Sequence, residues 1–256
     1  MLETFPGPIT AFVQGSSRGI GLSLVRRLLD CDRVDRIIAG ARNPRASDAL
    51  MELAESNPQR LRPVALDVTR PEQIEALATT LGEENVRPGL VLNVAGLLHD
   101  GADLAPEKRL EDLSADRLQR VFAVNVLGPA LVMRHLLPLM RGQDKAVFAA
   151  LSARVGSIGD NRLGGWYAYR SSKAALNQML HTASIEARRR FSNVIIAALH
   201  PGTTDTGLSR PFQANVPDGK LFSPDFVADR LLQVIDGLEG KDSGGFFAWD
   251  GQAIPW

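Results

Sequence analysis

The sequence predicts an α/β fold, a doubly wound parallel sheet of about seven strands with helices on both faces. Short apolar runs alternate with helical patterns along the whole chain, which is typical of a parallel sheet. A glycine-rich turn follows the first apolar run and opens the first helical pattern. No linker or internal repeat interrupts the 256 residues. We therefore expect one Rossmann-type domain spanning 1–256.

The charge composition excludes several classes of partner. Lys and Arg together number 29, as do Asp and Glu, so no basic field exists to hold nucleic acid or a membrane surface. The single cysteine, Cys31, is interpreted as a packing residue. One cysteine allows no internal disulfide, which fits a reducing compartment. The chain begins with no signal-peptide pattern, contains no long apolar run, and its four histidines lack metal-ligand spacing. We expect a cytoplasmic protein without a bound metal.

The first strand, Ile9 to Gln14, leads into a turn with the spacing Gly-x3-Gly-x-Gly. Glycines there let the backbone turn tightly and approach a pyrophosphate, which the N-terminus of the next helix then binds. The spacing differs from the commoner G-x-G-x-x-G fingerprint. The residues of this turn expected to bind a dinucleotide are Gly15, Ser17, Arg18, Gly19, Ile20 and Gly21.

Arg42 follows the second strand, Arg36 to Ala41. In dinucleotide-binding folds an acidic residue near this point binds the ribose hydroxyls, whereas an arginine meets a 2′-phosphate. No acid is present, and Arg18 could join Arg42 on the phosphate. The sequence therefore favours NADP(H), with NAD(H) possible; the alternative is that both arginines are only solvated.

Two further strands end in short polar or small-residue segments. The third ends at Val64 to Leu66, and the residues Thr69 and Glu72 after it form a predicted capping box with Pro71 in the first helical turn. The fourth runs from Leu90 to Val94 and closes on a small-residue turn. Such turns at the carboxyl ends of strands lie where ligands bind in open α/β sheets.

A long helix is predicted from Ser114 to about Met140, with Asn125 among apolar neighbours. An unpaired buried amide costs about 1–3 kcal/mol, so Asn125 needs a partner. It could bridge backbone groups or hold a functional water. Pro129 should disturb the helix nearby.

After a fifth strand, Ala146 to Leu151, a helix from Trp166 to about Arg190 carries Tyr169 and Lys173. Residues at i and i+4 share one helix face. A phenol has a pKa of about 10 in isolation, and a nearby positive charge lowers it. The pair therefore predicts a proton donor that works near neutral pH. The alternative is an ordinary surface tyrosine.

The last third of the chain has a sixth strand, Asn193 to Leu199, and a possible seventh, Gly245 to Trp249. The segment 207–222 is rich in proline and glycine and has little periodicity. That composition favours a mobile lid over a site. Ser223 is the predicted cap of the last helix, with Pro224 at its first position.

In their order these motifs resemble the short-chain dehydrogenase/reductase family over essentially the whole chain. The fragments around Gly156 and from Tyr167 to Asn177 resemble more narrowly the C-factor/sniffer-like carbonyl reductase branch. The residues that carry the resemblance are Gly15, Gly19, Ile20, Gly21, Asp67, Val68, Asn93, Val94, Ala95, Gly96, Asn125, Tyr169, Lys173, Pro201 and Gly202.

The resemblance implies an NAD(P)-dependent oxidoreductase that interconverts a carbonyl compound and its alcohol. Tyr169 would give the proton, Lys173 would lower its pKa and bind the nicotinamide ribose, and Asn125 would hold a relay water. The resemblance also implies a homodimer or homotetramer. Cofactor contacts are implied for Asp67 and Val68 at the adenine, Asn93, Ala95 and Gly96 at the adenosine ribose, and Thr203 and Thr206 at the carboxamide end. The resemblance also implies that Pro201 and Gly202 bind the cofactor.

One departure from the family pattern concerns the catalytic serine. The family's Ser-Ser reads here as Ser152-Ala153, so alanine takes the place of the hydroxyl that would polarise the substrate carbonyl. Ser152 is a tentative substitute, although strand alternation turns its side chain the other way, and Ser157 is another candidate. A cofactor-binding sensor with weak turnover is the alternative function, and a dehydratase or epimerase on the same fold also stays open.

Overall fold

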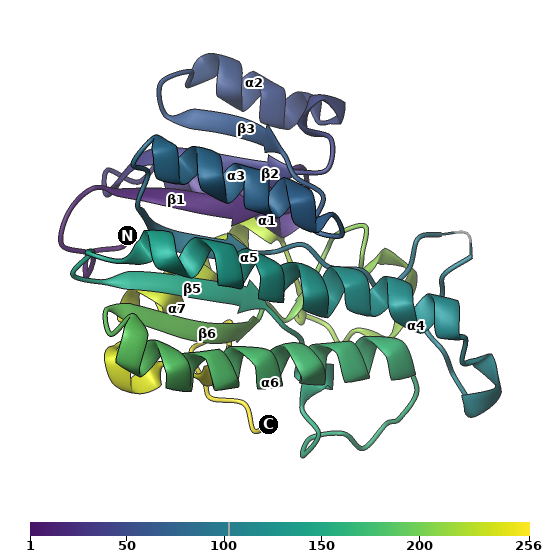
Figure 1. The fold of residues 1–256 in the computed structure, drawn as a ribbon. Coiled ribbons are helices and arrows are strands. Elements are labelled where there is room, and N and C mark those ends of the chain that lie inside the picture. The colour runs from purple at the N-terminus through teal and green to yellow at the C-terminus, as the bar shows by residue number, and fades with distance from the viewer. Residues whose placement is uncertain (102) are drawn as a thin grey trace.

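The computed structural model describes residues 1–101 and 103–256, and at position 215 the backbone alone. Its centre is a parallel seven-stranded sheet in the order β3-β2-β1-β4-β5-β6-β9 (Figure 1). The predicted fold class is confirmed. The strands are β1 Ile9–Gln14, β2 Val34–Ala41, β3 Leu61–Ala65, β4 Pro88–Asn93, β5 Ala146–Leu151, β6 Val194–His200 and β9 Gly245–Ala248.

Helices cover both faces of this sheet (Figure 1). Helices α1 and α7, with α2, contribute to the hydrophobic cluster on one face, and α3, α5 and α6 contribute to the cluster on the other. The helices are α1 Gly19–Leu29, α2 Asp48–Ser56, α3 Pro71–Glu83, α4 Ala115–Phe122, α5 Gly128–Leu136, α6 Tyr167–Arg190 and α7 Pro224–Gly237.

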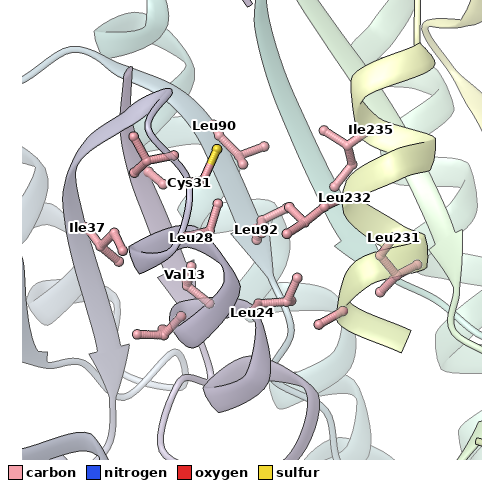
Figure 2. Close-up of a cluster of buried hydrophobic side chains, with 14 of the residues drawn as sticks. Val13, Leu24, Leu28, Cys31, Ile37, Leu90, Leu92, Leu231, Leu232 and Ile235 are labelled. Atoms are coloured by element: carbon pink, nitrogen blue, oxygen red, sulfur yellow. The ribbon is translucent and has the colours of Figure 1, made fainter. Parts of the chain in front are cut away.

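The core between the sheet and helices α1 and α7 is made of interlocking aliphatic side chains (Figure 2). Leu24 and Leu28 of α1 and Leu232 of α7 are almost fully buried there. Burying one such side chain contributes about 1.5–3 kcal/mol. Cys31 is buried in the same cluster, as expected of a packing residue, and its thiol donates to the Met1 carbonyl.

The order of the strands creates a crevice at one edge of the sheet. β1 pairs with β2 on one side and with β4 on the other, so the chain reverses its direction of travel across the sheet between β1 and β4. Ligands bind outside the carboxyl ends of the strands at such a point. The glycine turn after β1, the small-residue turn after β4, Ser152 after β5 and Pro201 after β6 all lie at this edge.

The long helix is continuous from Ala115 to Met140 but irregular in the middle. A π-helical turn, η3 Ala123–Leu127, separates α4 from α5, and a 3₁₀ turn, η4 Leu137–Met140, ends it. Pro129 lies in the first turn of α5, so the missing N–H of proline falls next to the widened turn, as the sequence indicates.

By length and composition alone this helix resembles a membrane span, since its best window has a mean hydropathy of 1.4. Half of that window is buried inside the fold, and α5 contacts α3 and the sheet. We therefore interpret it as a core helix.

The predicted helix cap is confirmed at α7 and wrong at α3. Ser223 caps α7, accepting the Phe226 N–H. The capping box at Thr69 is wrong: α3 begins at Pro71, and within the described residues no side chain caps it. Thr69 instead donates from its backbone N–H and its hydroxyl to Asp67. Such a local turn competes with helix capping.

Candidate active site

The turn after β1 has the geometry of a phosphate cradle. Gly15 has φ +90° and Gly19 has φ +53°, the left-handed region that glycine adopts without strain. A Cβ on Gly21 would lie 2.0 Å from the Gly15 carbonyl oxygen, so only glycine fits there. The first N–H groups of α1 have no partner within the helix. They form a site for an anion such as a pyrophosphate.

The two arginines predicted to meet a 2′-phosphate are both exposed. The Ser17 carbonyl accepts a hydrogen bond of 2.7 Å from Ser47, which ties the glycine turn to the segment after β2. Burial raises the pKa of Asp67, but hydrogen bonds from Thr69 and the charges of Arg42 and Arg70 outweigh it, and the pKa falls below its usual value. Arg42 and Asp67 are thus close enough to interact. Arg18 extends its guanidinium toward Gly207.

The turn after β4 packs against both the glycine turn and α6. A Cβ on Gly15 would lie 2.7 Å from the Ala95 nitrogen, and one on Gly96 would lie 3.7 Å from both Asn125 Oδ1 and Lys173 Nζ. Ala95 and Gly96 therefore border the crevice. Val68 is 5% exposed and packs on Gly128.

Asn93 differs from the other residues of this turn. Its side chain is 2% exposed and borders an interior cavity with Leu92 and Ala149. Neither polar atom of its amide has a hydrogen-bond partner among the described residues. Its amide lies inside the fold, which gives no support to the predicted contact with a ribose.

Asn125 lies in the π-helical turn and is fully buried. Its Oδ1 accepts the Leu97 N–H at 2.7 Å, and its Nδ2 donates to the Leu97 carbonyl at 2.8 Å and to Ser172 Oγ at 3.1 Å. Ser172 donates in turn to the Tyr169 carbonyl. The amide thus bridges backbone groups, the first of the two sequence alternatives, and it links the turn after β4 to α6.

Tyr169 and Lys173 lie one turn apart on α6, at 8% and 2% exposure. Lys173 Nζ lies 5.6 Å from the centroid of the Tyr169 ring and donates to the Leu151 carbonyl at 2.8 Å. Burial raises the pKa of Tyr169 and lowers the pKa of Lys173 to about 8. The lowering of the phenol pKa expected from the sequence is therefore absent, because loss of water around the phenolate dominates.

The segment 207–222 lies across the crevice. Just before it, β7 (Thr203–Thr204) pairs with β8 (Leu221–Phe222), and the 3₁₀ turn η6 (Arg210–Asn215) lies between these strands. A Cβ on Gly19 would lie 3.1 Å from Thr206 Cγ2, so Thr206 borders the phosphate cradle. Pro201 and Gly202 precede β7, and Gly202 has φ +74°. The sequence did not predict the β7–β8 pair.

Aromatic rings connect this segment to α6. The Phe212 ring lies 5.7 Å from the His99 ring and 4.9 Å from Trp166, and Trp166 lies 6.3 Å from Tyr169. His99 Nε2 lies 3.1 Å from the Gly207 carbonyl oxygen and 3.2 Å from that of Leu208. Since both neighbours are acceptors, Nε2 carries the proton and donates.

Comparison with known proteins identifies the family. The sequence model of the short chain dehydrogenase family matches residues 9–217. The chain belongs to this family. It is therefore an oxidoreductase, as the resemblance implied.

Similar proteins cover nearly the whole dehydrogenase. It is 31% identical over 247 residues to the 1-hydroxy-2-glutathionyl-2-methyl-3-butene dehydrogenase of Rhodococcus sp. (strain AD45), covering 96% of this chain and 99% of the relative. The NADPH-bound carbonyl reductase from chicken fatty liver superimposes with a TM-score of 0.86 and 29% identity, covering 98% of this chain and all of that one.

The narrower resemblance is also confirmed. C-signal of Myxococcus xanthus is 37% identical over 147 residues, covering 57% of this chain and 83% of C-signal. The carbonyl reductase Sniffer of D. melanogaster has a TM-score of 0.85 at 23% identity, covering 97% of this chain and all of Sniffer, which shows a shared fold.

Alanine stands at the position that the resemblance assigns to the family's catalytic serine. Ser152 is 3% exposed, and its hydroxyl donates to Asn177 Oδ1 at 2.6 Å. The structure gives no support to the tentative catalytic assignment of Ser152, because its hydroxyl is buried and bound to α6. Ala153 is extended and partly exposed. Ser157 is buried, and its Oγ accepts the Asp160 N–H.

Sequence reasoning missed several residues around the dehydrogenase site, namely Glu107, Trp166 and Phe212. Trp166 adopts a left-handed conformation with φ +53° directly before α6. Glu107 is a carboxylate at 2% exposure. Glu107 belongs to no periodic pattern or motif, and Trp166 was marked only as the expected start of the helix, so no local signal assigned either residue to the site.

Proposed function

We propose that this dehydrogenase reduces a ketone or aldehyde to its alcohol with NADPH, or runs the reverse reaction. The observation that carries the proposal is the pair of buried residues Tyr169 and Lys173 on α6, at the crevice that Gly96 borders. A buried phenol whose pKa is raised stays protonated at neutral pH. It is then a proton donor rather than a base in its resting state.

The choice of NADP(H) rests on charge at the end of β2. Arg42 follows the strand directly, and Arg18 lies in the glycine turn. Guanidinium groups suit a phosphate dianion. The similar chicken carbonyl reductase is an NADPH-bound protein, which supports the same choice. NAD(H) remains a weaker ligand in this proposal, because it lacks the 2′-phosphate.

In the proposed reaction, NADPH held at the glycine turn would provide the hydride that the carbonyl carbon accepts. The π electrons of the carbonyl bond move to its oxygen, and the Tyr169 hydroxyl gives that oxygen a proton. The phenolate left behind is stabilised by the Lys173 ammonium, which the Leu151 carbonyl holds in place. Asn125 ties the backbone of Leu97 to Ser172, whose hydroxyl donates to the Tyr169 carbonyl. Pre-positioning of donor and acceptor lowers the barrier.

The walls around Tyr169 favour an uncharged, apolar substrate. Trp166 and Phe212 form an aromatic surface beside the phenol. Burying a charge against such a surface without a partner is costly. In this proposal the segment 207–222 is a lid that opens when the two His99 hydrogen bonds break. Exposed apolar residues on η3 and α6, namely Leu127, Met179 and Ile185, support a homodimer or homotetramer formed through these helices.

A sensor with little turnover is the second candidate, and Ala153 is the observation that favours it. Without a hydroxyl there, the substrate carbonyl loses one donor that would stabilise developing negative charge. The presence of Tyr169, Lys173 and Asn125 favours the enzyme.

One experiment separates the two functions. NADPH oxidation is followed across a panel of apolar aldehydes and ketones, while NADPH binding is measured by quenching of tryptophan fluorescence. Turnover of several carbonyl compounds supports the reductase. Tight cofactor binding without turnover of any compound supports the sensor, and no binding of either cofactor overturns both.

A further inference from the structure

Glu107 is a buried carboxylate that the reaction described above does not use. It lies in the segment between β4 and α4 and is 2% exposed. Its hydrogen-bond partner, Ala168, follows 61 residues later in the sequence. Its Oε2 accepts the Ala168 N–H at 3.1 Å, and its backbone carbonyl accepts the Trp166 N–H at 2.5 Å. Charged side chains are almost never fully buried unless paired. Its location therefore calls for a physical reason.

The N-terminus of α6 provides that reason. Its N-cap residue, Trp166, is left-handed, and within the described residues its side chain caps nothing. The first turn of α6 contains no acidic residue. The first N–H groups of a helix lack intrahelical partners and carry a partial positive charge, which an anion stabilises. Ala168 is the second residue of α6, a usual target of an N-cap oxygen. Glu107 thus supplies from a distant segment the cap that the local sequence lacks.

The capped turn is the one that carries the proton donor, since Tyr169 follows Ala168 directly. The opposite end of the same turn is held by Ser172, which donates to the Tyr169 carbonyl and accepts from Asn125. Two residues from outside α6 therefore hold this turn: Glu107 directly at Ala168, and Asn125 through Ser172. Loss of one partner frees the turn to fray, because terminal helix turns are held by few hydrogen bonds.

We propose that Glu107 is a positioning residue for the reduction: its side chain caps α6 and so fixes the orientation of the Tyr169 hydroxyl toward the substrate. This inference rests on the proposed function only for the role of Tyr169. The main-chain contact to Trp166 does not depend on the side chain at 107. Substitutions at Glu107 therefore test the cap separately from the aromatic wall.

The test compares Glu107→Ala, which removes the cap, with Glu107→Gln, which keeps an acceptor oxygen of similar reach. Glu111→Gln is the matched control, because Glu111 is an exposed carboxylate in the same segment. We expect Glu107→Ala to lower kcat about tenfold while KM changes less than about twofold, since misplacement of a reacting group acts on the chemical step. Glu107→Gln should recover most of the rate, and Glu111→Gln should match the parent protein.

A second readout does not depend on turnover. The chain has two tyrosines, Tyr167 and Tyr169, so ring-labelled tyrosine gives two sets of NMR resonances that Tyr167→Phe assigns. In Glu107→Ala we expect the Tyr169 resonances to shift or broaden and amide exchange to rise in residues 166–172 alone. The parent pattern should persist in Glu107→Gln.

Two results would overturn the inference. One is a Glu107→Ala protein whose kcat, Tyr169 resonances and local exchange all match the parent. The other is exchange raised throughout the protein, with kcat lost in proportion to folded protein, which would mean a general structural role. If the parent protein turns over no carbonyl compound, the proposed function fails, yet the resonance and exchange measurements still decide whether Glu107 fixes Tyr169.

Discussion

The ammonium of Lys173 lies beside the ring of Tyr169 rather than against its hydroxyl. Nζ is 5.6 Å from the ring centroid and donates to the carbonyl of Leu151, the last residue of β5. The sheet therefore holds the charge in the crevice, and the helix holds the phenol next to it. This arrangement leaves the phenol protonated in the free protein, because burial raises the pKa of Tyr169.

Tyr169→Phe should abolish reduction while cofactor binding stays nearly unchanged. General acid catalysis contributes about 10²- to 10⁴-fold in rate, and phenylalanine keeps the ring but has no proton to give. The measurements are kcat with the best carbonyl substrate and the NADPH dissociation constant. Tyr167→Phe is the control, and a Tyr169→Phe enzyme that keeps most of its rate would rule out this residue as the acid.

The buried Lys173 should make stability depend on pH in a defined window. Burial lowers its pKa from 10.5 to about 8, so between these values the unfolded chain binds a proton that the folded protein has released. The free energy of unfolding then rises with pH from about 8 toward 10, by up to about 3 kcal/mol. Urea denaturation at several pH values measures it. Lys173→Met should remove this rise, and identical slopes in both proteins would contradict the lowered pKa of the buried amine.

Arg42→Ala should weaken NADPH binding far more than NADH binding. Charge-assisted hydrogen bonds contribute about 1.5–3 kcal/mol each, or roughly 10- to 100-fold in affinity. Titration of both cofactors by fluorescence gives the ratio. Arg36→Ala, an exposed arginine earlier on β2, serves as the control. Equal losses for the two cofactors would overturn the preference for NADP(H).

Ala153→Ser should raise kcat, by about tenfold or more, because it restores a donor for the developing oxyanion. The extended backbone at Ala153 accepts serine without strain. Ser152→Ala should act differently: it leaves Asn177 Oδ1 without its donor and destabilises the fold by about 1–3 kcal/mol, with kcat little changed. Steady-state kinetics and thermal unfolding together separate these effects. A large loss of kcat in Ser152→Ala would restore it as a catalytic candidate.

The parallel sheet and the phosphate cradle could be predicted because their signals are local. Apolar runs alternating with helical patterns give a parallel sheet, and glycines at the end of β1 have few structural alternatives. The same local reasoning failed at Thr69, where a turn with Asp67 replaced the expected helix cap. A pattern of residue types does not say whether the Thr69 side chain accepts from the first turn of the helix or donates to Asp67.

Much of the site depends on contacts between distant segments. Glu107 meets Ala168, and Phe212 meets Trp166, only after the chain has folded. No periodicity links such residues. Asn125 shows the intermediate case: the sequence marks it as a buried amide that needs partners, but the choice of Leu97 and Ser172 follows from the width of the π-helical turn and the packing against α6.

The π-helical turn determines how far α5 is rotated about the axis of the 115–140 helix relative to α4. A regular helix advances about 100° per residue, so an additional residue in one turn rotates everything after it relative to everything before it. In the folded chain α4 packs against α6, while α5 packs against α3 and β4 as well as α6. Removing a single residue between Ala123 and Leu127 would restore regular α-helical geometry between α4 and α5. It would also rotate the Asn125 amide out of the interior. The chain should tolerate substitutions there more readily than any change in its length.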